Sequence, residues 1–152
     1  MNEAKVKGSF CFPKKERLHH RSLVEGLFRN GKTFYEFPFR ATWRLISPEE
    51  LQRNFRDRVP QDIAKLQMMV TVPKKKRRRA VDRVLMRRRI REAFRLNKAS
   101  LNALLESVPE AATLSLALVY IHDKNLNYAF VNEKMKATIA KVQNLIAPQP
   151  EK

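Results

Sequence analysis

Apolar and polar residues alternate most clearly over residues 37–46, where the pattern predicts a β-strand. Apolar side chains take every second position, and arginine or threonine the positions between: Phe39, Ala41, Trp43 and Leu45 against Arg40, Thr42 and Arg44. A period of two places the two sets on opposite faces of a strand. One face is therefore expected to pack into a core, and the face that carries two arginines is expected to lie outside it.

Two further apolar runs have the length of strands. Residues 66–72 are followed by Pro73, and residues 114–121 by a polar turn. The stretch 47–65 contains two prolines and mixed charge, with Ser47 as a candidate helix cap, and it predicts an irregular connection with room for a helical turn. Either a further strand lies near this connection, or residues 66–72 pair directly with the first strand.

Helical spacing of apolar residues predicts three helices. The first covers residues 15–30, the longest covers residues 80–106 and is closed by Pro109, and the last starts near Asn127. The core-facing positions of the two longer helices are Met86, Ile90, Ala93, Phe94, Leu101 and Leu104, and Val131, Met135, Ile139, Val142 and Ile146. With the strands, these helices give the element order α-β-β-β-α-β-α.

The composition fits one folded domain. At roughly 100–200 residues per domain, the 152 residues predict a single unit spanning 1–152, with loose termini over about 1–13 and 147–152. The N-terminus lacks the apolar core of a signal peptide, and no apolar run is long enough to span a membrane. The single cysteine, Cys11, permits no intrachain disulfide. We therefore expect a cytoplasmic protein in which Cys11 is an inert thiol.

Basic residues exceed acidic residues by a wide margin and are unevenly distributed. The chain holds 32 lysines and arginines against 15 acids, which gives a net charge of +17. Residues 73–98 alone hold 13 of these basic residues and two of the acids. A compact chain with this charge repels itself unless a polyanion neutralises it. Nucleic acid is therefore the favoured partner, and an anionic membrane surface is the weaker alternative.

The basic segment combines a lysine-rich loop, residues 74–79, with an arginine stripe on the helix that follows. The stripe consists of Arg87, Arg91 and Arg95, with Arg88 and Lys98 beside it. The rise of an α-helix sets side chains four positions apart at about 6 Å, a spacing that suits successive phosphates of an RNA strand. We interpret the stripe as a phosphate track; the alternative is a solvated face or a localisation signal.

The remaining candidate chemistry is sparse. Aromatic residues that are candidates for stacking on unpaired bases are Phe28, Phe34, Tyr35, Phe37, Phe39 and Trp43. For Phe39 and Trp43, core packing is favoured because both share the apolar strand face. His19, His20 and His122 have no acid or cysteine at ligand spacing, so we predict surface histidines and no metal site. The sequence contains no nucleophile–base grouping, and we expect no catalytic protein side chain.

Residues 80–95 (AVDRVLMRRRIREAFR) resemble the RNR motif of the bacterial ribonuclease P protein component. The matching positions are Ala80, Val81, Arg83, Arg87, Arg88, Arg91 and Phe94. Residues 70–75 (VTVPKK) resemble the strand and basic loop of that family, residues 17–34 its first helix, and residues 126–146 its last helix. The resemblance spans nearly the whole chain in the same element order.

The resemblance implies both a fold and a function. The fold is a two-layer α/β (α+β) sandwich, similar to the second domain of ribosomal protein S5, with a left-handed βαβ crossover. The function is that of the protein subunit of ribonuclease P, an endonuclease whose RNA subunit holds most of the Mg²⁺ and removes the 5′ leader of precursor tRNA. The protein would bind that RNA and the leader as a monomer in a 1:1 complex, with no organic cofactor, no DNA and no membrane.

The resemblance also implies two sets of site residues. The RNA-binding set is Lys74, Lys75, Arg79, Arg83, Arg87, Arg88, Arg91 and Arg95. The leader cleft, between the first helix and the sheet, is formed by Val24, Phe28, Arg40 and Thr42. The family's Asn and second Arg correspond to Val84 and Leu85 here, so the family's contacts at those positions are not assigned to this chain. Val84 falls inside the basic stripe.

The same composition is compatible with three alternative functions. The first is a ribosomal or other structural RNA-binding protein, but such a protein needs basic residues without the spacing found in residues 80–94. The second is a DNA-binding protein, which competition between precursor tRNA and duplex DNA would separate. The third is a self-sufficient protein nuclease, which is disfavoured because the sequence contains no acid cluster to hold its metal ions.

Overall fold

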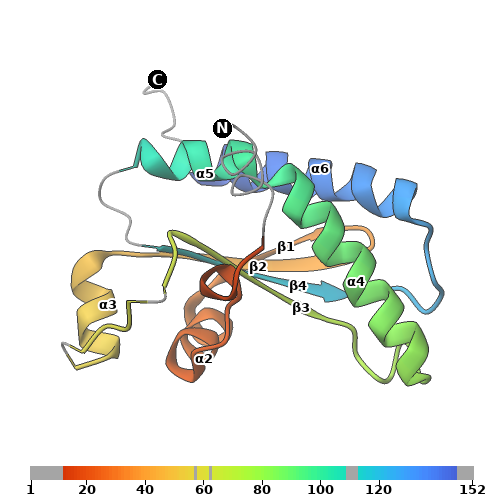
Figure 1. Ribbon diagram of the computed structural model, residues 1–152, viewed down its shortest axis with the longest axis horizontal. Helices are drawn as coiled ribbons and strands as arrows, with labels where there is room; N and C mark the ends of the chain where they lie inside the picture. Colours follow the sequence, from red (N-terminus) through yellow and green to blue (C-terminus); the bar gives the residue numbers. More distant parts are fainter. Residues whose placement is uncertain (1–11, 57, 62, 109–112, 147–152) are drawn as a thin grey trace, which may run out of the picture.

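The computed structural model describes residues 12–56, 58–61, 63–108 and 113–146 (Figure 1). The helical elements are the 3₁₀ turn η1 (Lys14–Glu16), α2 (Arg21–Asn30), α3 (Pro48–Asn54), α4 (Ala80–Asn97), α5 (Ala99–Glu106) and α6 (Tyr128–Ile146). The strands are β1 (Lys32–Glu36), β2 (Phe39–Ile46), β3 (Leu66–Thr71) and β4 (Thr113–Tyr120). Within these ranges no helix is long and apolar enough to cross a membrane. Cys11 lies outside the described residues, as do residues 147–152.

The four strands form one mixed sheet in the order β1-β2-β4-β3. β2 pairs antiparallel with β1 and with β4, whereas β3 runs parallel to β4. A parallel pair requires a crossover connection, which α4 and α5 supply. The predicted order α-β-β-β-α-β-α is confirmed, with α3 and α5 as additional short helices. The further strand is β1, directly after α2 and not near residues 47–65, and β3 pairs with β4 and not, as the other alternative had it, with β2. The left-handed sense of the crossover stays a prediction.

Helices cover both faces of the sheet (Figure 1). The main core lies between the sheet and the helices α4, α5 and α6, and a smaller cluster lies under α2 and α3 on the other face. All eight residues of β4 are buried because β4 is a central strand with helices on either side. The mixed α/β sandwich is confirmed, with α2 and α3 as a partial further layer. Phe39 and Trp43 are buried in the main core, as predicted.

The first helix begins at Arg21 and not at residue 15. Between η1 and α2 the chain is extended and lies along the outer edge of β3, where Arg17 forms a β-bridge with Met68 and the Leu18 amide donates to the Met68 carbonyl at 3.0 Å. An edge strand offers unpaired backbone groups, and this segment satisfies some of them. Leu18 therefore belongs to an extended segment and not to the helix predicted over residues 15–30.

The long helix predicted over residues 80–106 is divided at Lys98 into α4 and α5. In α5 the fully buried leucines are Leu101 and Leu105, one turn apart, and Leu104 is only partly buried. Lys98 does not widen the basic stripe as predicted, because its side chain is buried and forms an ion pair with Glu16. At the break between α4 and α5, the side chain of Lys98, a cation of the basic segment, is therefore buried and not exposed.

Residues 47–65 contain a helix of two turns rather than a strand. Ser47 caps α3, since its hydroxyl accepts a hydrogen bond from the Glu50 amide at 3.3 Å, and Pro48 occupies the first helical position. Leu51 is the residue of α3 that is buried under the sheet. The candidate cap in the sequence is therefore confirmed, and the helical turn is longer than expected.

Candidate nucleic-acid interface

The helix α4 separates its apolar and basic residues onto different faces. Its buried residues are Met86, Ile90, Ala93 and Phe94, which hold the helix on the sheet. Four arginines of the predicted RNA-binding set line a pocket of about 340 Å³ between the helix and the segment that precedes α2. We call it the α4 pocket; its walls are Phe12, Arg17, Val84, Arg87, Arg88, Arg91, Glu92 and Arg95. The structure thus brings half of the predicted set together around one concave surface.

Five arginines and one acid, Glu92, line the α4 pocket. Arg95 pairs with Glu92, whose Oε2 lies 3.0 Å from the arginine Nε. Burial, and then the charges of Arg17 and Arg87, lower the pKa of the Arg91 guanidinium below its ordinary value. Like charges that disfavour each other's ionised form are relieved by an anion placed between them. The electrostatics of the pocket therefore favour a phosphate or another anionic group.

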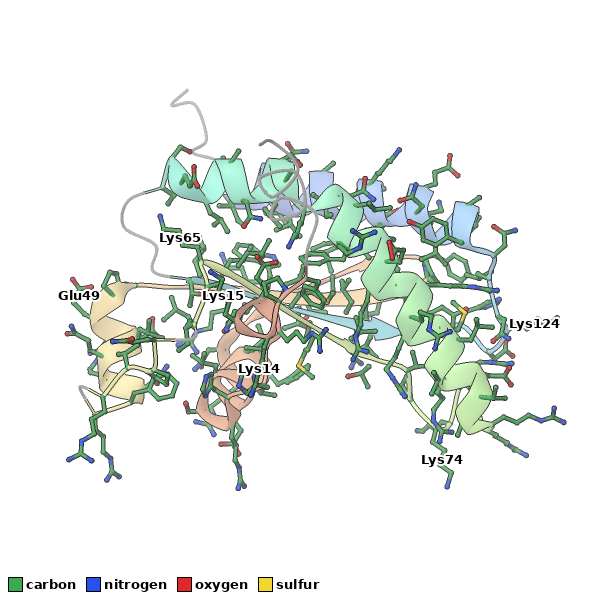
Figure 2. The ribbon with its side chains drawn as sticks, in the orientation of Figure 1. Lys14, Lys15, Glu49, Lys65, Lys74 and Lys124 are labelled. Atoms are coloured by element: carbon green, nitrogen blue, oxygen red, sulfur yellow. The ribbon has the colours of Figure 1, made fainter. Side chains whose placement is uncertain are left out.

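The lysine-rich loop between β3 and α4 forms a second basic surface. A hollow of about 620 Å³, the loop pocket, is lined by Lys75, Lys76, Arg77, Arg78, Arg79, Asp82 and Asp123. Lys74 is exposed beside it and points away from the molecule next to the start of α4 (Figure 2). Of the predicted set, Lys75 and Arg79 line this pocket, and Lys74 stands at its border. These lysines and Arg79 are free to reach a partner because their side chains are exposed.

Two arginines hold the loop in shape. Arg77 pairs with Asp82 at 3.0 Å and donates to the Asp123 carbonyl at 2.6 Å. Arg83 donates through one nitrogen to the carbonyls of Arg77, at 3.0 Å, and Arg78, at 2.7 Å. Arg83, predicted to contact RNA, is thus engaged with the backbone of the basic loop. Its position indicates that it orients the neighbouring cations.

The turn after β4 is fixed against the same end of α4. Asn125 donates to Asp82 at 3.0 Å, and Arg89 donates to the Leu126 carbonyl at 2.5 Å. The hydroxyl of Tyr120 donates to the Lys124 carbonyl, and burial raises the pKa of this tyrosine to about 12. A turn distant in sequence therefore helps to hold the loop pocket. Sequence reasoning missed these residues, because single polar side chains carry no periodic signal.

A third surface lies on the opposite face of the sheet, beside α2. We call it the α2–sheet cleft; its volume is about 390 Å³, and its walls are Phe28, Thr33, Tyr35, Arg40 and Thr42. Phe28, Arg40 and Thr42 of the predicted cleft come together here. Tyr35, predicted only as a candidate for base stacking, also lines this cleft, whereas Thr33 was not predicted because β1 was not located; the register pairs Thr33 with Thr42 and Tyr35 with Arg40. The hydroxyls of Thr33 and Thr42 lie 3.1 Å apart.

Two residues near this cleft are used differently from the prediction. Val24 packs against the small core under α2 and is not among the residues that line the cleft. Arg44, the second arginine on that strand face, pairs with Glu50 of α3. A Cβ at Gly26 would meet the Arg44 guanidinium, which would have to shift to make room for it. Arg40 is therefore the arginine of β2 that serves the cleft.

The histidines lie at the surface of the described structure without a metal cluster. Within the described ranges, no three histidine, cysteine, aspartate or glutamate residues are grouped to hold a metal ion. The rings of His19 and His20 are 4.3 Å apart, and the His20 ring packs edge-on against Phe55 at 5.5 Å. His122 lies 3.7 Å from the Asp123 carboxylate. The chemistry that these surfaces offer is anion binding and base stacking.

Several known proteins are similar to this chain in sequence and in fold. Residues 12–143 match the family model described as Ribonuclease P. Ribonuclease P protein components from two strains of Porphyromonas gingivalis, W83 and ATCC 33277, are each 32% identical over 134 residues, which is 88% of either chain. The RNase P protein of Staphylococcus aureus superposes with a TM-score of 0.58 at 15% identity, over 88% of this chain and 100% of its own. The RNase P protein of Thermotoga maritima superposes with a TM-score of 0.56 at 18% identity, over 83% of this chain and 96% of its own.

Proposed function

Because the chain belongs to the ribonuclease P protein family, we propose that it binds the catalytic RNA subunit of ribonuclease P and the 5′ leader of precursor tRNA. The protein and the RNA subunit together promote endonucleolytic removal of the leader. The observation that carries this proposal is the group of arginines on α4 that face away from the core and line one pocket. Such an arrangement serves a polyanion, since phosphate contacts supply most of the affinity in protein–nucleic acid complexes.

The RNA subunit is assigned to the α4 side of the molecule. The contacts proposed there are Lys74, Lys75, Arg79, Arg87, Arg88, Arg91 and Arg95, with Arg83 as a positioning residue for the loop. Guanidinium groups bind phosphate oxygens in a fixed, forked geometry, whereas lysines act as mobile point charges. The stripe would fix the register of the RNA on the protein, and the loop would extend the contact beyond the end of α4.

The 5′ leader is assigned to the α2–sheet cleft. Its aromatic walls, Phe28 and Tyr35, are 48% and 64% exposed, so their ring faces are open to unpaired bases. Arg40 supplies a cation and Thr42 a hydroxyl on the strand side. Single-stranded RNA is bound by this combination of stacking surface and positive charge. Val24 supports α2 from below, through the small core.

Catalytic Mg²⁺ is assigned to the RNA subunit and not to this chain. The residues that line the α4 and loop pockets are mostly cations, which do not ligate Mg²⁺. The contribution of the protein is to place positive charge between two polyanions, the RNA subunit and the precursor, so that their mutual repulsion falls. The protein would act as a monomer in a 1:1 complex in the cytoplasm, without an organic cofactor.

Phe28→Ala is expected to lower the affinity of the reconstituted enzyme for precursor tRNA about tenfold, because one stacking platform is lost. Affinity for mature tRNA, which lacks the leader, should stay the same. The measurement is equilibrium binding of both RNAs under conditions that block cleavage. Phe37→Ala is the matched control, since Phe37 is 46% exposed and lies outside the cleft, and its ring packs edge-on against His122 and Phe130. Equal losses for precursor and mature tRNA would count against a leader site in this cleft.

The alternative functions are separated by competition. A structural RNA-binding protein would bind unrelated structured RNA as tightly as the ribonuclease P RNA, and a DNA-binding protein would exchange precursor tRNA for duplex DNA. At matched phosphate concentration, we expect unrelated structured RNA to compete poorly with the ribonuclease P RNA, and duplex DNA to compete poorly with precursor tRNA. The reason is that the α4 pocket and the cleft offer walls for unpaired nucleotides as well as charge. Equal competition by duplex DNA would overturn the proposal.

A further inference from the structure

Val84 is an apolar residue in the middle of the basic stripe. Its side chain is 44% exposed and lines the α4 pocket beside Arg87, Arg88 and Arg91. It does not belong to the core face of α4, whose buried residues lie elsewhere around the helix. A valine side chain has neither charge nor a hydrogen-bond donor with which to bind a phosphate. Its position therefore points to a ligand group that is not a phosphate.

Phe12 lines the same pocket. The Phe12 ring packs edge-on against Phe94 of the core, with ring centroids 5.7 Å apart. The guanidinium carbon of Arg17 lies 5.4 Å from its centroid, and the ammonium of Lys98 lies 5.8 Å away. The ring is thus held in place from several sides while still contributing to the pocket wall. Phe12 precedes η1, and the chain before α2 brings this aromatic residue to α4.

The α4 pocket therefore has two kinds of wall. One is apolar or aromatic, from Val84 and Phe12, and the other consists of guanidinium groups that can bind phosphate or stack on a base. A ligand that matches both carries a flat ring and a phosphate next to it. A volume of about 340 Å³ is at the small end of ligand pockets, which suits a single nucleotide and not a duplex.

We propose that the α4 pocket receives one unpaired nucleotide of the RNA subunit, with its base against Val84 and Phe12 and its phosphates on the surrounding arginines. This inference rests on the proposed function and adds a specific contact to it. The RNA subunit is favoured over the tRNA leader because the pocket lies on the helix that covers one face of the sheet, and the α2–sheet cleft lies on the other. It also gives Val84 a role where the family motif has asparagine.

Val84→Asn tests the proposal without changing charge, and Leu96→Asn is its control. Leu96 lies on the same helix, is 41% exposed and does not line the pocket. Val84→Asn should weaken binding of the ribonuclease P RNA at least about fivefold, because the apolar contact with the base is lost. The dependence of affinity on salt should not change, since no phosphate contact is removed. Leu96→Asn should bind as the wild type does.

Chemical probing of the RNA subunit identifies the nucleotide. Dimethyl sulfate and a carbodiimide, which between them modify the pairing edges of all four unpaired bases, are applied to the RNA with each variant. We expect one unpaired base to be protected by the wild type and by Leu96→Asn but modified with Val84→Asn, while the other protections persist. A second variant, Val84→Trp, fills the pocket and should expose the same base.

The outcomes separate this inference from the proposed function. If the wild type binds the RNA subunit and promotes cleavage, but Val84→Asn gives the same affinity and the same protections, the nucleotide pocket is overturned and the proposed function stands. Protection of a tRNA base in place of an RNA-subunit base would overturn the assignment to the RNA subunit. If the wild type does not bind the RNA subunit at all, the proposed function itself fails.

Discussion

Replacing Arg87 and Arg91 together with alanine is expected to weaken binding of the ribonuclease P RNA roughly 15-fold to 30-fold at about 0.15 M salt. Each arginine that neutralises one phosphate contributes about 0.7 to 0.9 to the slope of log affinity against log salt concentration. The double variant should therefore flatten that slope by about 1.4 to 1.8. Both side chains line the α4 pocket, and neither belongs to the core face of α4. Binding is measured by filter retention across a salt series.

The control for this variant removes the same charge elsewhere. Arg53 on α3 and Lys136 on α6 are exposed and lie outside the α4 pocket and the loop pocket. Arg53→Ala combined with Lys136→Ala should leave the slope within about half a unit of the wild type, since only long-range attraction is reduced. A slope that falls equally in both double variants would mean that net charge, and not the stripe on α4, binds the RNA. An unchanged slope in the first variant would refute the phosphate track.

Phe94→Ala is expected to lower the free energy of unfolding by about 3 to 5 kcal/mol, a large part of the stability of a typical domain. Phe94 is fully buried where α4 meets the core, and it also carries the edge-on contact with Phe12. The cost combines the lost apolar burial with the cavity that remains. The midpoint of thermal unfolding should fall by about 10 °C, which circular dichroism and denaturant titration would both report.

Phe28→Ala is the matched substitution at an exposed phenylalanine. Its ring is 48% exposed in the α2–sheet cleft, so its loss should cost less than about 1 kcal/mol of stability while reducing leader binding. The two variants therefore separate a phenylalanine that supports the fold from one that is available to a ligand. Comparable destabilisation by both would mean that Phe28 is a core residue and would remove it from the proposed leader site.

The periodic features of the sequence predict much of this structure. The alternation over β2 places Phe39 and Trp43 in the core and Arg40 and Thr42 on the cleft face, as observed. The spacing of arginines on α4 likewise predicts which of them share a pocket. These predictions succeed because the side of a strand or helix on which a residue lies follows from its position in the repeat, independently of tertiary contacts.

The remaining features depend on contacts between segments that are distant in sequence. The extended residues before α2 are specified by the free edge of β3, and the burial of Lys98 by its ion pair with Glu16. The ion pair of Arg77 with Asp82 and the hydrogen bond from Asn125 to Asp82 connect two loops that are more than 40 residues apart in the sequence. Short segments such as β1 have too few residues for a periodic signal, so Thr33, and the place of Tyr35 in the cleft, emerge only from the sheet register.

The most direct test of the proposed function is reconstitution of cleavage. Purified protein, the ribonuclease P RNA of the same organism and end-labelled precursor tRNA are combined at low Mg²⁺, and leader release is followed with each component present or omitted. We predict cleavage that requires the RNA and that the protein accelerates strongly, since positive charge between the two RNAs lowers their repulsion. A protein that binds the RNA but leaves the rate of leader release unchanged would contradict the proposal and would indicate a structural RNA-binding protein instead.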